Sequence, residues 1–278
     1  MSTYNLTPEQ QDEIRRRLKG TRLEALAISS GLLPPPDYEE RILKEMVRKS
    51  ASTLALVKDA KILSKVDEPV LITGPTGSGK ELVAGLVHGC DRKGRFVPVN
   101  TTAIVDTLFE SELFGHKQGS FTGANENRLG LIAEASNGTL FLDEIGDMGL
   151  STQAKLLRLI ENRQYRMVGD SKLLDSNCRI VCATHRDLAK LVKQGKFRED
   201  LFYRISVFEL KVAPLKERRE DYEYLAASFD LPEEASDTVW HLSTLPGNVR
   251  QLKNIARYYN VLGKLPPVIS STEENLSS

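Results

Sequence analysis

The sequence predicts an α/β fold in which helices cover both faces of a five-stranded parallel sheet, as an α-β-α sandwich. Short apolar runs rich in β-branched residues alternate with helical patterns, which is typical of strand-helix-strand units. A glycine-rich turn follows the first of these runs, and an acidic pair ends the third. With 278 residues, the chain is long enough for one large domain, or two unequal ones, around a substantial core.

Composition indicates a globular protein with no strong overall charge. The 38 basic and 38 acidic side chains balance, which excludes a field that would draw the whole molecule to nucleic acid. Cys90, Cys178 and Cys182 form no CxxC pair and indicate neither a disulfide framework nor a zinc cluster. Because no signal peptide and no run of about 20 apolar residues is present, we expect a cytoplasmic protein without a membrane partner.

The first part of the chain, 1–36, predicts a short helical extension. Thr7 is a candidate N-cap at its start, and the proline triplet 34–36 ends it. A helical pattern then resumes, and we assign 37–213 to the α/β core.

Five apolar runs are expected to form the strands of this core: Val70–Thr73, Phe96–Val99, Thr139–Leu142, Ile180–Ala183 and Val207–Val212. After Pro214 the pattern becomes helical, so 214–263 is expected to form a small helical lid. The last residues, 264–278, are polar and are expected to form a tail.

A glycine-rich run predicts a phosphate-binding loop. GPTGSGK lies between a predicted strand and a helical pattern, which is the context that such a loop requires. Its backbone N–H groups and the helix N-terminus would face a phosphate, and Lys80 would reach the outer phosphates. A glycine turn of no function is the alternative. The residues expected to bind ATP are Gly74, Pro75, Thr76, Gly77, Ser78, Gly79, Lys80 and Glu81, although Glu81 replaces the hydroxyl residue that usually contacts magnesium.

Asp143 and Glu144 end the third predicted strand, where carboxylates emerge at the carboxyl edge of the sheet beside the phosphate loop. Asp143 is expected to bind Mg²⁺, directly or through water, and Glu144 to orient or polarise the attacking water. Two solvated acids are the alternative for an isolated pair. Their place downstream of a phosphate loop favours catalysis.

Further motifs resemble a known family. The run ESELFGHKQGSFTGA ends in a hexapeptide, 119–124, similar to the GAFTGA hallmark of sigma-54-dependent activators, the bacterial enhancer-binding proteins. The resemblance extends from about Pro69 to Asn254, through FVPVN, GTLFLDEIGDM, ATHRDL, GKFREDLFYRISVF and PGNVRQLKN in the family's order. It implies an AAA+ P-loop NTPase that uses ATP and Mg²⁺ to remodel sigma-54 RNA polymerase holoenzyme.

The resemblance also implies a role for the hexapeptide. In the family this loop projects from the ATPase ring, and its Phe and Thr touch the sigma factor. The residues expected to contact the partner are Gly119, Ser120, Phe121, Thr122, Gly123 and Ala124. An aromatic residue between two glycines suits an exposed contact, although the residue types alone equally fit a buried anchor. Ser120 replaces the usual Ala.

Other positions near the nucleotide take their roles from the same resemblance. Asn100 matches the residue that holds and releases the Walker B glutamate. Thr184 and His185 match sensor I, where many relatives carry Asn in place of His185, and a partly exposed histidine without a role is the alternative. Arg250 matches sensor II and should lie in the first turn of a helix started by Pro-Gly.

Two arginines match the family's arginine fingers. Arg198 and Arg204 would reach the nucleotide of a neighbouring subunit and stabilise the charge that develops in phosphoryl transfer. An ordinary surface ion pair is the alternative. Fingers acting in trans imply a homo-oligomeric ring, expected to be a hexamer.

Several features depart from the family. The stretch from Pro214 to Pro246 is short for its lid, and Leu245 replaces the expected Trp, so we predict a shortened lid. No helix-turn-helix is readable after Asn254 and no receiver-like domain precedes the core, which leaves the DNA contact open. Two alternatives therefore stand beside an active ATPase: a nucleotide-binding regulator of other activators with little turnover, and an AAA+ machine acting on another protein.

Overall fold

The computed structural model describes residues 42–43, 45–89, 94–102, 106–121 and 123–267. The predicted N-terminal extension lies outside these residues, as does most of the predicted polar tail.

Five parallel strands form the central sheet, in the order β2 (Phe96–Asn100), β5 (Thr139–Asp143), β8 (Arg179–Thr184), β1 (Val70–Thr73) and β9 (Phe208–Lys211). Each strand coincides with a predicted apolar run to within one residue at either end. Because parallel neighbours cannot be joined by tight turns, the chain crosses between them through helices. The carboxyl ends of all five strands consequently meet along one edge.

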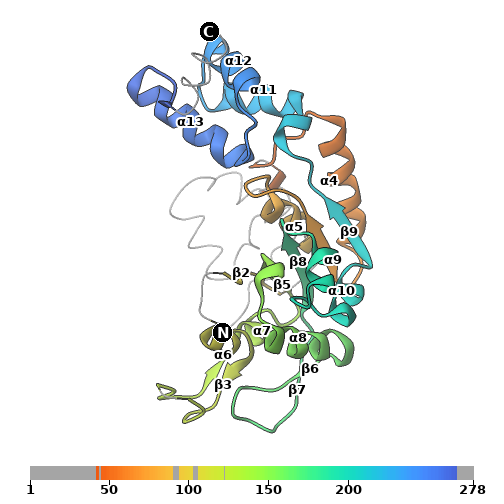
Figure 1. Cartoon of the computed structure of the whole chain (residues 1–278). Helices are drawn as coiled ribbons and strands as arrows, with labels where there is room; N and C mark the ends of the chain where they lie inside the picture. Colours follow the sequence, from red (N-terminus) through yellow and green to blue (C-terminus); the bar gives the residue numbers. More distant parts are fainter. Residues whose placement is uncertain (1–41, 44, 90–93, 103–105, 122, 268–278) are drawn as a thin grey trace, which may run out of the picture.

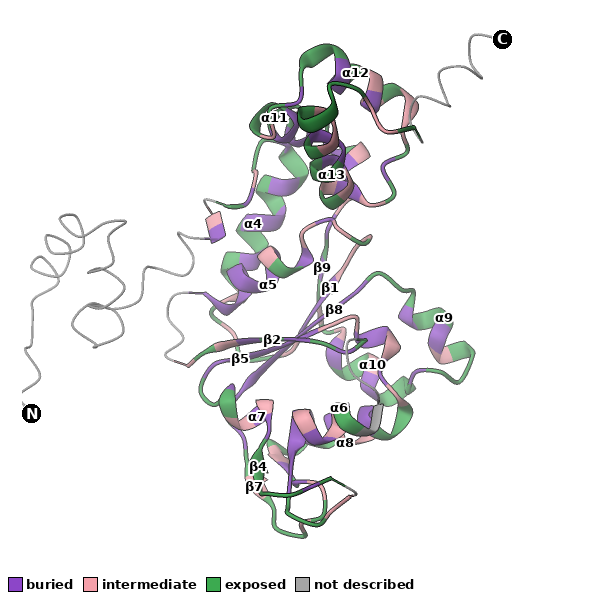
Figure 2. Cartoon of the chain, turned by 90° about the vertical axis from the view of Figure 1, so that its left-hand side faces the viewer, coloured by how far each residue is buried: buried purple, intermediate pink, exposed green. Residues whose placement is uncertain are grey.

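Helices cover both faces of the sheet (Figure 2). One face carries α4 (Ala51–Leu63) and α5 (Lys80–His88). The opposite side of the core carries α6 (Asp106–Phe114), α7 (Leu131–Glu134), η1 (Ile145–Asp147), α8 (Leu150–Asn162), α9 (Leu188–Lys193) and α10 (Glu199–Ile205). Alternate strand residues supply the two cores: Val70 and Ile72 pack with α4 and α5, whereas Leu71 packs on the other side. The predicted α-β-α sandwich is confirmed.

The chain after Pro214 forms the helical lid (Figure 1). It contains η2 (Leu215–Glu217), α11 (Arg219–Ser228), α12 (Glu233–Leu242) and α13 (Asn248–Leu262). These helices enclose a core of their own that includes Tyr222 and Val239, and Leu245 is buried within it. Whether this lid is shorter than that of relatives stays a prediction.

Two short antiparallel hairpins extend from the end of the core away from the lid (Figure 1). They are β3 (Gly115–His116) with β4 (Arg128–Leu129), and β6 (Gln164–Tyr165) with β7 (Leu174–Asp175). These hairpins were not predictable from the sequence, because two-residue strands are too short to show a period of two.

None of the helices in the described part of the chain combines the length and apolar character needed to span a membrane.

Asp221 of α11 holds the lid against the start of α4. Its buried carboxylate accepts hydrogen bonds from the backbone N–H groups of Lys49 and Ser50 at 2.6 and 2.9 Å, and from the hydroxyls of Ser50 and Thr53 at 2.8 and 2.5 Å. The Arg218 guanidinium lies 3.6 Å away. Burial acts to raise the pKa of Asp221, but these hydrogen bonds outweigh it and hold the pKa below its usual value.

We expect Asp221→Ala to lower the free energy of unfolding by about 3–5 kcal/mol, because Arg218 would stay buried without its charge partner. Urea unfolding at neutral pH measures the change. Since the pKa is lowered, the stabilisation is present above the unfolded-state pKa and is lost as the pH falls, so the difference from wild type should shrink in acid. The exposed lid residue Asp237, changed to Ala, is the control and should cost less than about 0.5 kcal/mol. Equal losses for both variants would contradict this role.

Candidate nucleotide site and contact loop

The glycine-rich run forms the turn between β1 and α5, as predicted. Gly77 has φ +73°, and a Cβ built there would lie 2.3 Å from the carbonyl oxygen of Gly247. Only glycine fits this position, because it must both adopt the left-handed region and approach another backbone closely. The helix α5 begins at Lys80, so its N-terminus faces the turn.

A cavity of about 300 Å³ lies between this turn, the lid and the carboxyl ends of β2 and β5. It is lined by these predicted residues: Thr76, Gly77, Ser78, Gly79, Lys80, Glu81, Asn100, Asp143, Glu144 and Arg250. A larger cavity, of about 540 Å³, lies between α8 and the β6–β7 hairpin and holds none of the predicted site residues. The motif residues therefore mark the smaller cavity as the candidate site.

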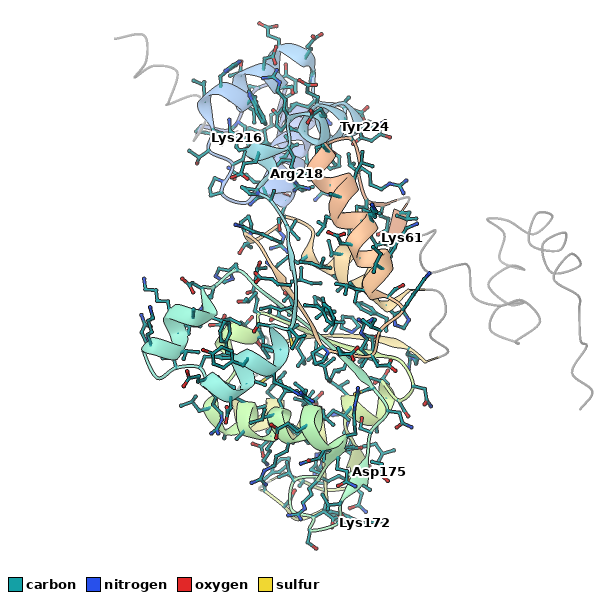
Figure 3. All side chains as sticks on the ribbon, turned by 90° about the vertical axis from the view of Figure 1, so that its right-hand side faces the viewer. Lys61, Lys172, Asp175, Lys216, Arg218 and Tyr224 are labelled. Carbon is teal, nitrogen blue, oxygen red and sulfur yellow. The ribbon has the colours of Figure 1, made fainter. Side chains whose placement is uncertain are left out.

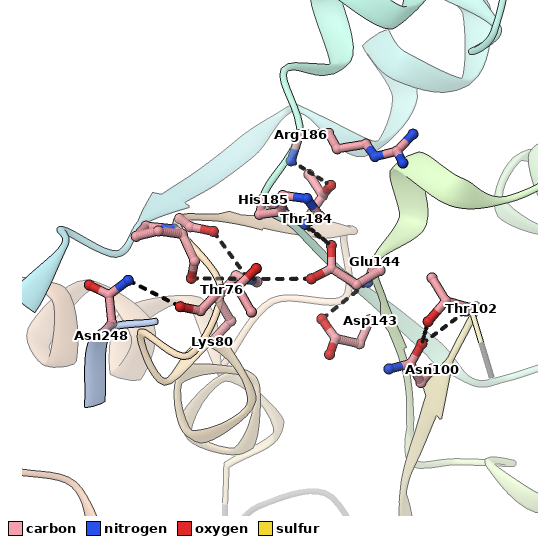
Figure 4. A network of polar contacts seen from close by, with 12 residues as sticks. Thr76, Lys80, Asn100, Thr102, Asp143, Glu144, Thr184, His185, Arg186 and Asn248 are labelled. Carbon is pink, nitrogen blue, oxygen red and sulfur yellow. Dashed lines mark hydrogen bonds and ion pairs between the residues drawn. The ribbon is translucent and has the colours of Figure 1, made fainter. Parts of the chain in front are cut away.

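Glu144 is held between Lys80 and His185 (Figure 4). Its Oε1 lies 3.7 Å from Lys80 Nζ, and its Oε2 lies 2.6 Å from His185 Nδ1. Lys80 Nζ also donates to the carbonyls of Gly74 and Pro75 at 3.1 and 3.3 Å. Each carboxylate oxygen of Glu144 therefore has a partner from a different element of the core.

Asp143 lies at the end of β5 in an environment that disfavours its charge. Burial raises its pKa above the usual value, the neighbouring Glu144 charge adds to this, and Lys80 opposes it. A cation placed beside Asp143 would reverse the effect. In addition, the Ser78 hydroxyl is buried and has no hydrogen-bond partner among the described residues. This donor set suits phosphate oxygens together with a hard cation such as Mg²⁺.

Asn100 lies at the end of β2, beside Asp143 in the sheet register. Its side-chain oxygen accepts hydrogen bonds from the N–H and hydroxyl of Thr102 at 2.9 and 2.7 Å (Figure 4). Glu144 is bound instead by Lys80 and His185. The expected contact between Asn100 and Glu144 is therefore not made in this conformation, and the switching role stays a prediction.

Of the remaining predicted residues, Arg250 lines the cavity, from the first turn of α13. The side chain of Thr184 is buried at the end of β8 and accepts a hydrogen bond from the Arg186 N–H at 3.0 Å. Arg198 and Arg204 both lie outside the cavity. Arg198 forms a double hydrogen bond with Asp200 at 3.0 and 2.7 Å.

Arg204 lines a separate cavity near the amino ends of β1, β8 and β9, which also includes Pro69, Ile180 and Val207. The amino ends of parallel strands lie at the edge of the sheet opposite the nucleotide site. Within one subunit, Arg204 therefore cannot reach the nucleotide that its own P-loop would bind.

The hexapeptide 119–124 lies in the loop of the β3–β4 hairpin, and Thr122 is outside the described residues. The Phe121 ring packs edge-on against His116 with ring centroids 5.1 Å apart. Ser120 lies close to the β6–β7 hairpin: a Cβ built on Gly169 would be 2.5 Å from the Cβ of Ser120. The aromatic residue is thus folded against the base of its own hairpin.

Backbone and charge contacts join the two hairpins. The N–H of Lys117 donates to the Val168 carbonyl at 3.0 Å, and the Val168 N–H donates to the Gly115 carbonyl at 2.8 Å. Lys117 Nζ lies 3.6 Å from Asp170. The loop of the second hairpin therefore supports the hexapeptide from the side.

Comparison with known proteins identifies the family. Residues 46–211 match the family described as the Sigma-54 interaction domain, which is more than half of the chain. The chain belongs to this family of sigma-54-dependent activators. Its fold is that of the AAA+ P-loop NTPases.

Relatives in this family cover most of the chain. The response regulator protein PilR of Pseudomonas aeruginosa is 44% identical over 250 residues, which are 84% of this chain and 56% of PilR. The DNA-binding transcriptional regulator NtrC of Azospirillum brasilense is 46% identical over 209 residues, 70% of this chain and 43% of NtrC. The chain thus spans about half the length of these relatives.

A solved structure agrees with the fold. NtrX from Brucella abortus in complex with ADP superposes with a TM-score of 0.75 and 29% identity, covering 96% of this chain and 62% of that chain. Its complex with ATP gives a TM-score of 0.74 at the same identity and covers 70% of that chain.

Sequence reasoning missed three parts of the site. Arg218 and Asp221 line the cavity from the lid, and Glu45 to Val47 line it from the segment before α4. The opposite charges of Arg218 and Asp221, three residues apart, were the available signal. That spacing is also common in ordinary surface pairs on helices, so the sequence could not distinguish the two.

We expect Gly77→Ala to weaken binding of a fluorescent ADP analogue by more than about tenfold, because the new Cβ would separate the loop from the lid. Fluorescence anisotropy gives the dissociation constant. Gly195→Ala is the matched control: it also has positive φ, at +67°, but meets nothing within 4 Å. It should carry backbone strain of about 1–2 kcal/mol and leave ADP affinity unchanged. Equal affinities for the two variants would argue against the close approach.

Proposed function

We propose that this protein hydrolyses ATP with Mg²⁺ and uses each cycle to remodel RNA polymerase bound to sigma-54 through the loop 119–124. The observation that carries the proposal is the arrangement of Glu144, fixed by Lys80 and His185 at the mouth of the phosphate loop. The family membership and the ADP and ATP complexes of NtrX support nucleotide binding here.

The residues of the cavity suit in-line hydrolysis. Lys80 would leave the carbonyls of Gly74 and Pro75 for the γ-phosphate, and the backbone N–H groups of the loop would hold the β-phosphate. Asp143 would hold Mg²⁺, which neutralises charge on the phosphates. Glu144 would orient a water whose oxygen attacks the γ-phosphorus, while the bond from that phosphorus to the ADP oxygen breaks.

Self-assembly would complete the site. Arg198 and Arg204 lie outside the cavity of their own subunit, and a neighbouring subunit in a ring could present them to the γ-phosphate. Arg198 would first have to leave Asp200, an exchange that is inexpensive because both side chains are exposed. A hexameric ring fits this requirement, and activity would depend on assembly.

The hairpin connects the site to its target. Strand β2 ends at Asn100 in the cavity and leads through α6 to the β3–β4 hairpin, so movement at the nucleotide has a short covalent path to Phe121. A partly exposed aromatic side chain at a loop tip suits a protein contact. Action on RNA polymerase would place the protein in the cytoplasm, and contact with DNA is left open.

The rate of ATP hydrolysis per subunit should rise with protein concentration in magnesium buffer, because active sites form between subunits. Arg198→Ala should reduce kcat by about a thousandfold or more without loss of ADP binding. Arg95→Ala, which removes another exposed arginine paired with a carboxylate, is the control and should hydrolyse ATP as wild type does. A wild-type protein that binds ATP but stays inert at every concentration would instead favour a nucleotide-binding regulator of other activators.

Phe121→Ala should abolish binding to sigma-54 polymerase trapped with a transition-state analogue, while ATP hydrolysis continues. Pull-down with purified holoenzyme and a phosphate-release assay measure the two properties separately. Ser120→Ala is the control: it restores the family's usual residue, and the hydroxyl that it removes has no partner in the described structure. It should bind as wild type does. Unchanged binding of Phe121→Ala would point to an AAA+ machine with another protein target.

A further inference from the structure

The back of the phosphate loop is bound by the lid. Three consecutive carbonyls accept hydrogen bonds from it: Thr76 from Asn248 Nδ2 at 3.0 Å, Gly77 from the Val249 N–H at 3.1 Å, and Ser78 from the Arg218 guanidinium at 3.3 Å. Together with the two carbonyls that Lys80 binds, every carbonyl from 74 to 78 has a donor.

These contacts bear on nucleotide binding because a peptide plane couples its two polar ends. The carbonyl of one residue and the N–H of the next lie in the same rigid plane and point in opposite directions. Holding the carbonyls of Thr76 and Ser78 therefore directs the N–H groups of Gly77 and Gly79 away from the lid, whereas the Ser78 N–H donates to the Pro75 carbonyl at 3.3 Å. Converging N–H groups of this kind are what bind a phosphate.

Asn248 provides the first side-chain link between the loop and the lid. It is buried, and its φ of +49° lies in the left-handed region that Asn tolerates better than most residues. Its Oδ1 accepts from the Leu215 N–H at 2.7 Å, where the chain leaves the core for the lid. Its Nδ2 donates to Thr76 and to Pro246. One side chain thus joins the phosphate loop, the lid entrance and the start of α13.

Arg218 provides the second side-chain link, at the junction of the lid with the core (Figure 3). The guanidinium is 5% exposed and lies 3.6 Å from Asp221 and 3.4 Å from the Thr53 hydroxyl. Its Nε is buried and has no hydrogen-bond partner in the described part of the chain. Because Arg218 belongs to the lid, a rotation of the lid would draw its guanidinium away from the Ser78 carbonyl.

We propose that Asn248 and Arg218 are positioning residues that set the shape of the phosphate loop according to the position of the lid. The inference rests on the proposed nucleotide binding and adds an effect of the lid on nucleotide affinity. Because coupling between two equilibria is reciprocal, nucleotide that orders the N–H groups must also tighten the lid, and a lid held closed must raise nucleotide affinity.

Asn248→Asp is the sharpest test. The variant keeps an acceptor for Leu215 and tolerance of the left-handed region, but it places a carboxylate oxygen against the Thr76 carbonyl. We expect affinity for the fluorescent ADP analogue to fall about tenfold, because the variant loses the hydrogen bond to the Thr76 carbonyl and places two oxygen atoms against each other. We also expect the loop amides 74–80 to exchange hydrogen faster without nucleotide, and ADP to lose its protecting effect on α11 and α12.

Asn260→Asp is the matched control, because Asn260 lies on the same helix and also donates to a backbone carbonyl, that of Phe229 at 2.9 Å. It should behave as wild type in all three measurements. Arg218→Lys, which retains a charge for Asp221, is a second variant for the case in which Asn248→Asp folds poorly. We expect it to weaken ADP binding several-fold.

The inference would be overturned if Asn248→Asp and Arg218→Lys matched Asn260→Asp in two measurements: hydrogen exchange of the loop amides, and protection of the lid by ADP. Hydrogen exchange of the loop without nucleotide separates this outcome from failure of the proposed function. A wild-type protein that binds no ADP would refute nucleotide binding, and the effect of Asn248→Asp on loop exchange would still decide whether the lid shapes the loop.

Discussion

Every polar group of a buried backbone needs a partner, and this constraint organises the structure around the phosphate loop. To bind a phosphate, the turn between β1 and α5 must direct N–H groups to one side, which leaves its carbonyls on the other. Lys80 donates to the carbonyls of Gly74 and Pro75, and the lid donates to the three carbonyls from 76 to 78. The lid is therefore part of the candidate phosphate site, and Asp221 holds the lid against the start of α4.

The parallel sheet places the remaining functions at a distance from one another. Its carboxyl edge brings Asp143, Glu144 and Asn100 to the loop, because all five strands run in the same direction. The β3–β4 hairpin and the lid extend from opposite ends of the core (Figure 1), and Arg204 lies at the amino edge of the sheet. Arg198 and Arg204 lie outside the cavity of their own subunit, which is consistent with the ring that we propose.

Much of the fold was predictable because it depends on local patterns. The five strands are short apolar runs bounded by turn residues, and the P-loop has a fixed spacing of glycines with Lys80 at its end. Arg250 lies in the first turn of its helix as the Pro-Gly pair indicated. The two hairpins were not predictable, since two-residue strands carry no periodicity, nor was the packing of Phe121 against His116, which depends on how the hairpin folds back.

The amino-acid order was enough to predict the candidate residues for chemistry: the phosphate loop, the acidic pair, the hexapeptide and the arginines. The partner of each side chain became visible in the folded molecule. Glu144 is bound by Lys80 and His185 while Asn100 is bound by Thr102, and Asn248 reaches a loop 172 residues away in the chain. The physical reason is that spacing along the chain reports only local conformation, whereas such contacts depend on how the sheet, hairpins and lid pack together.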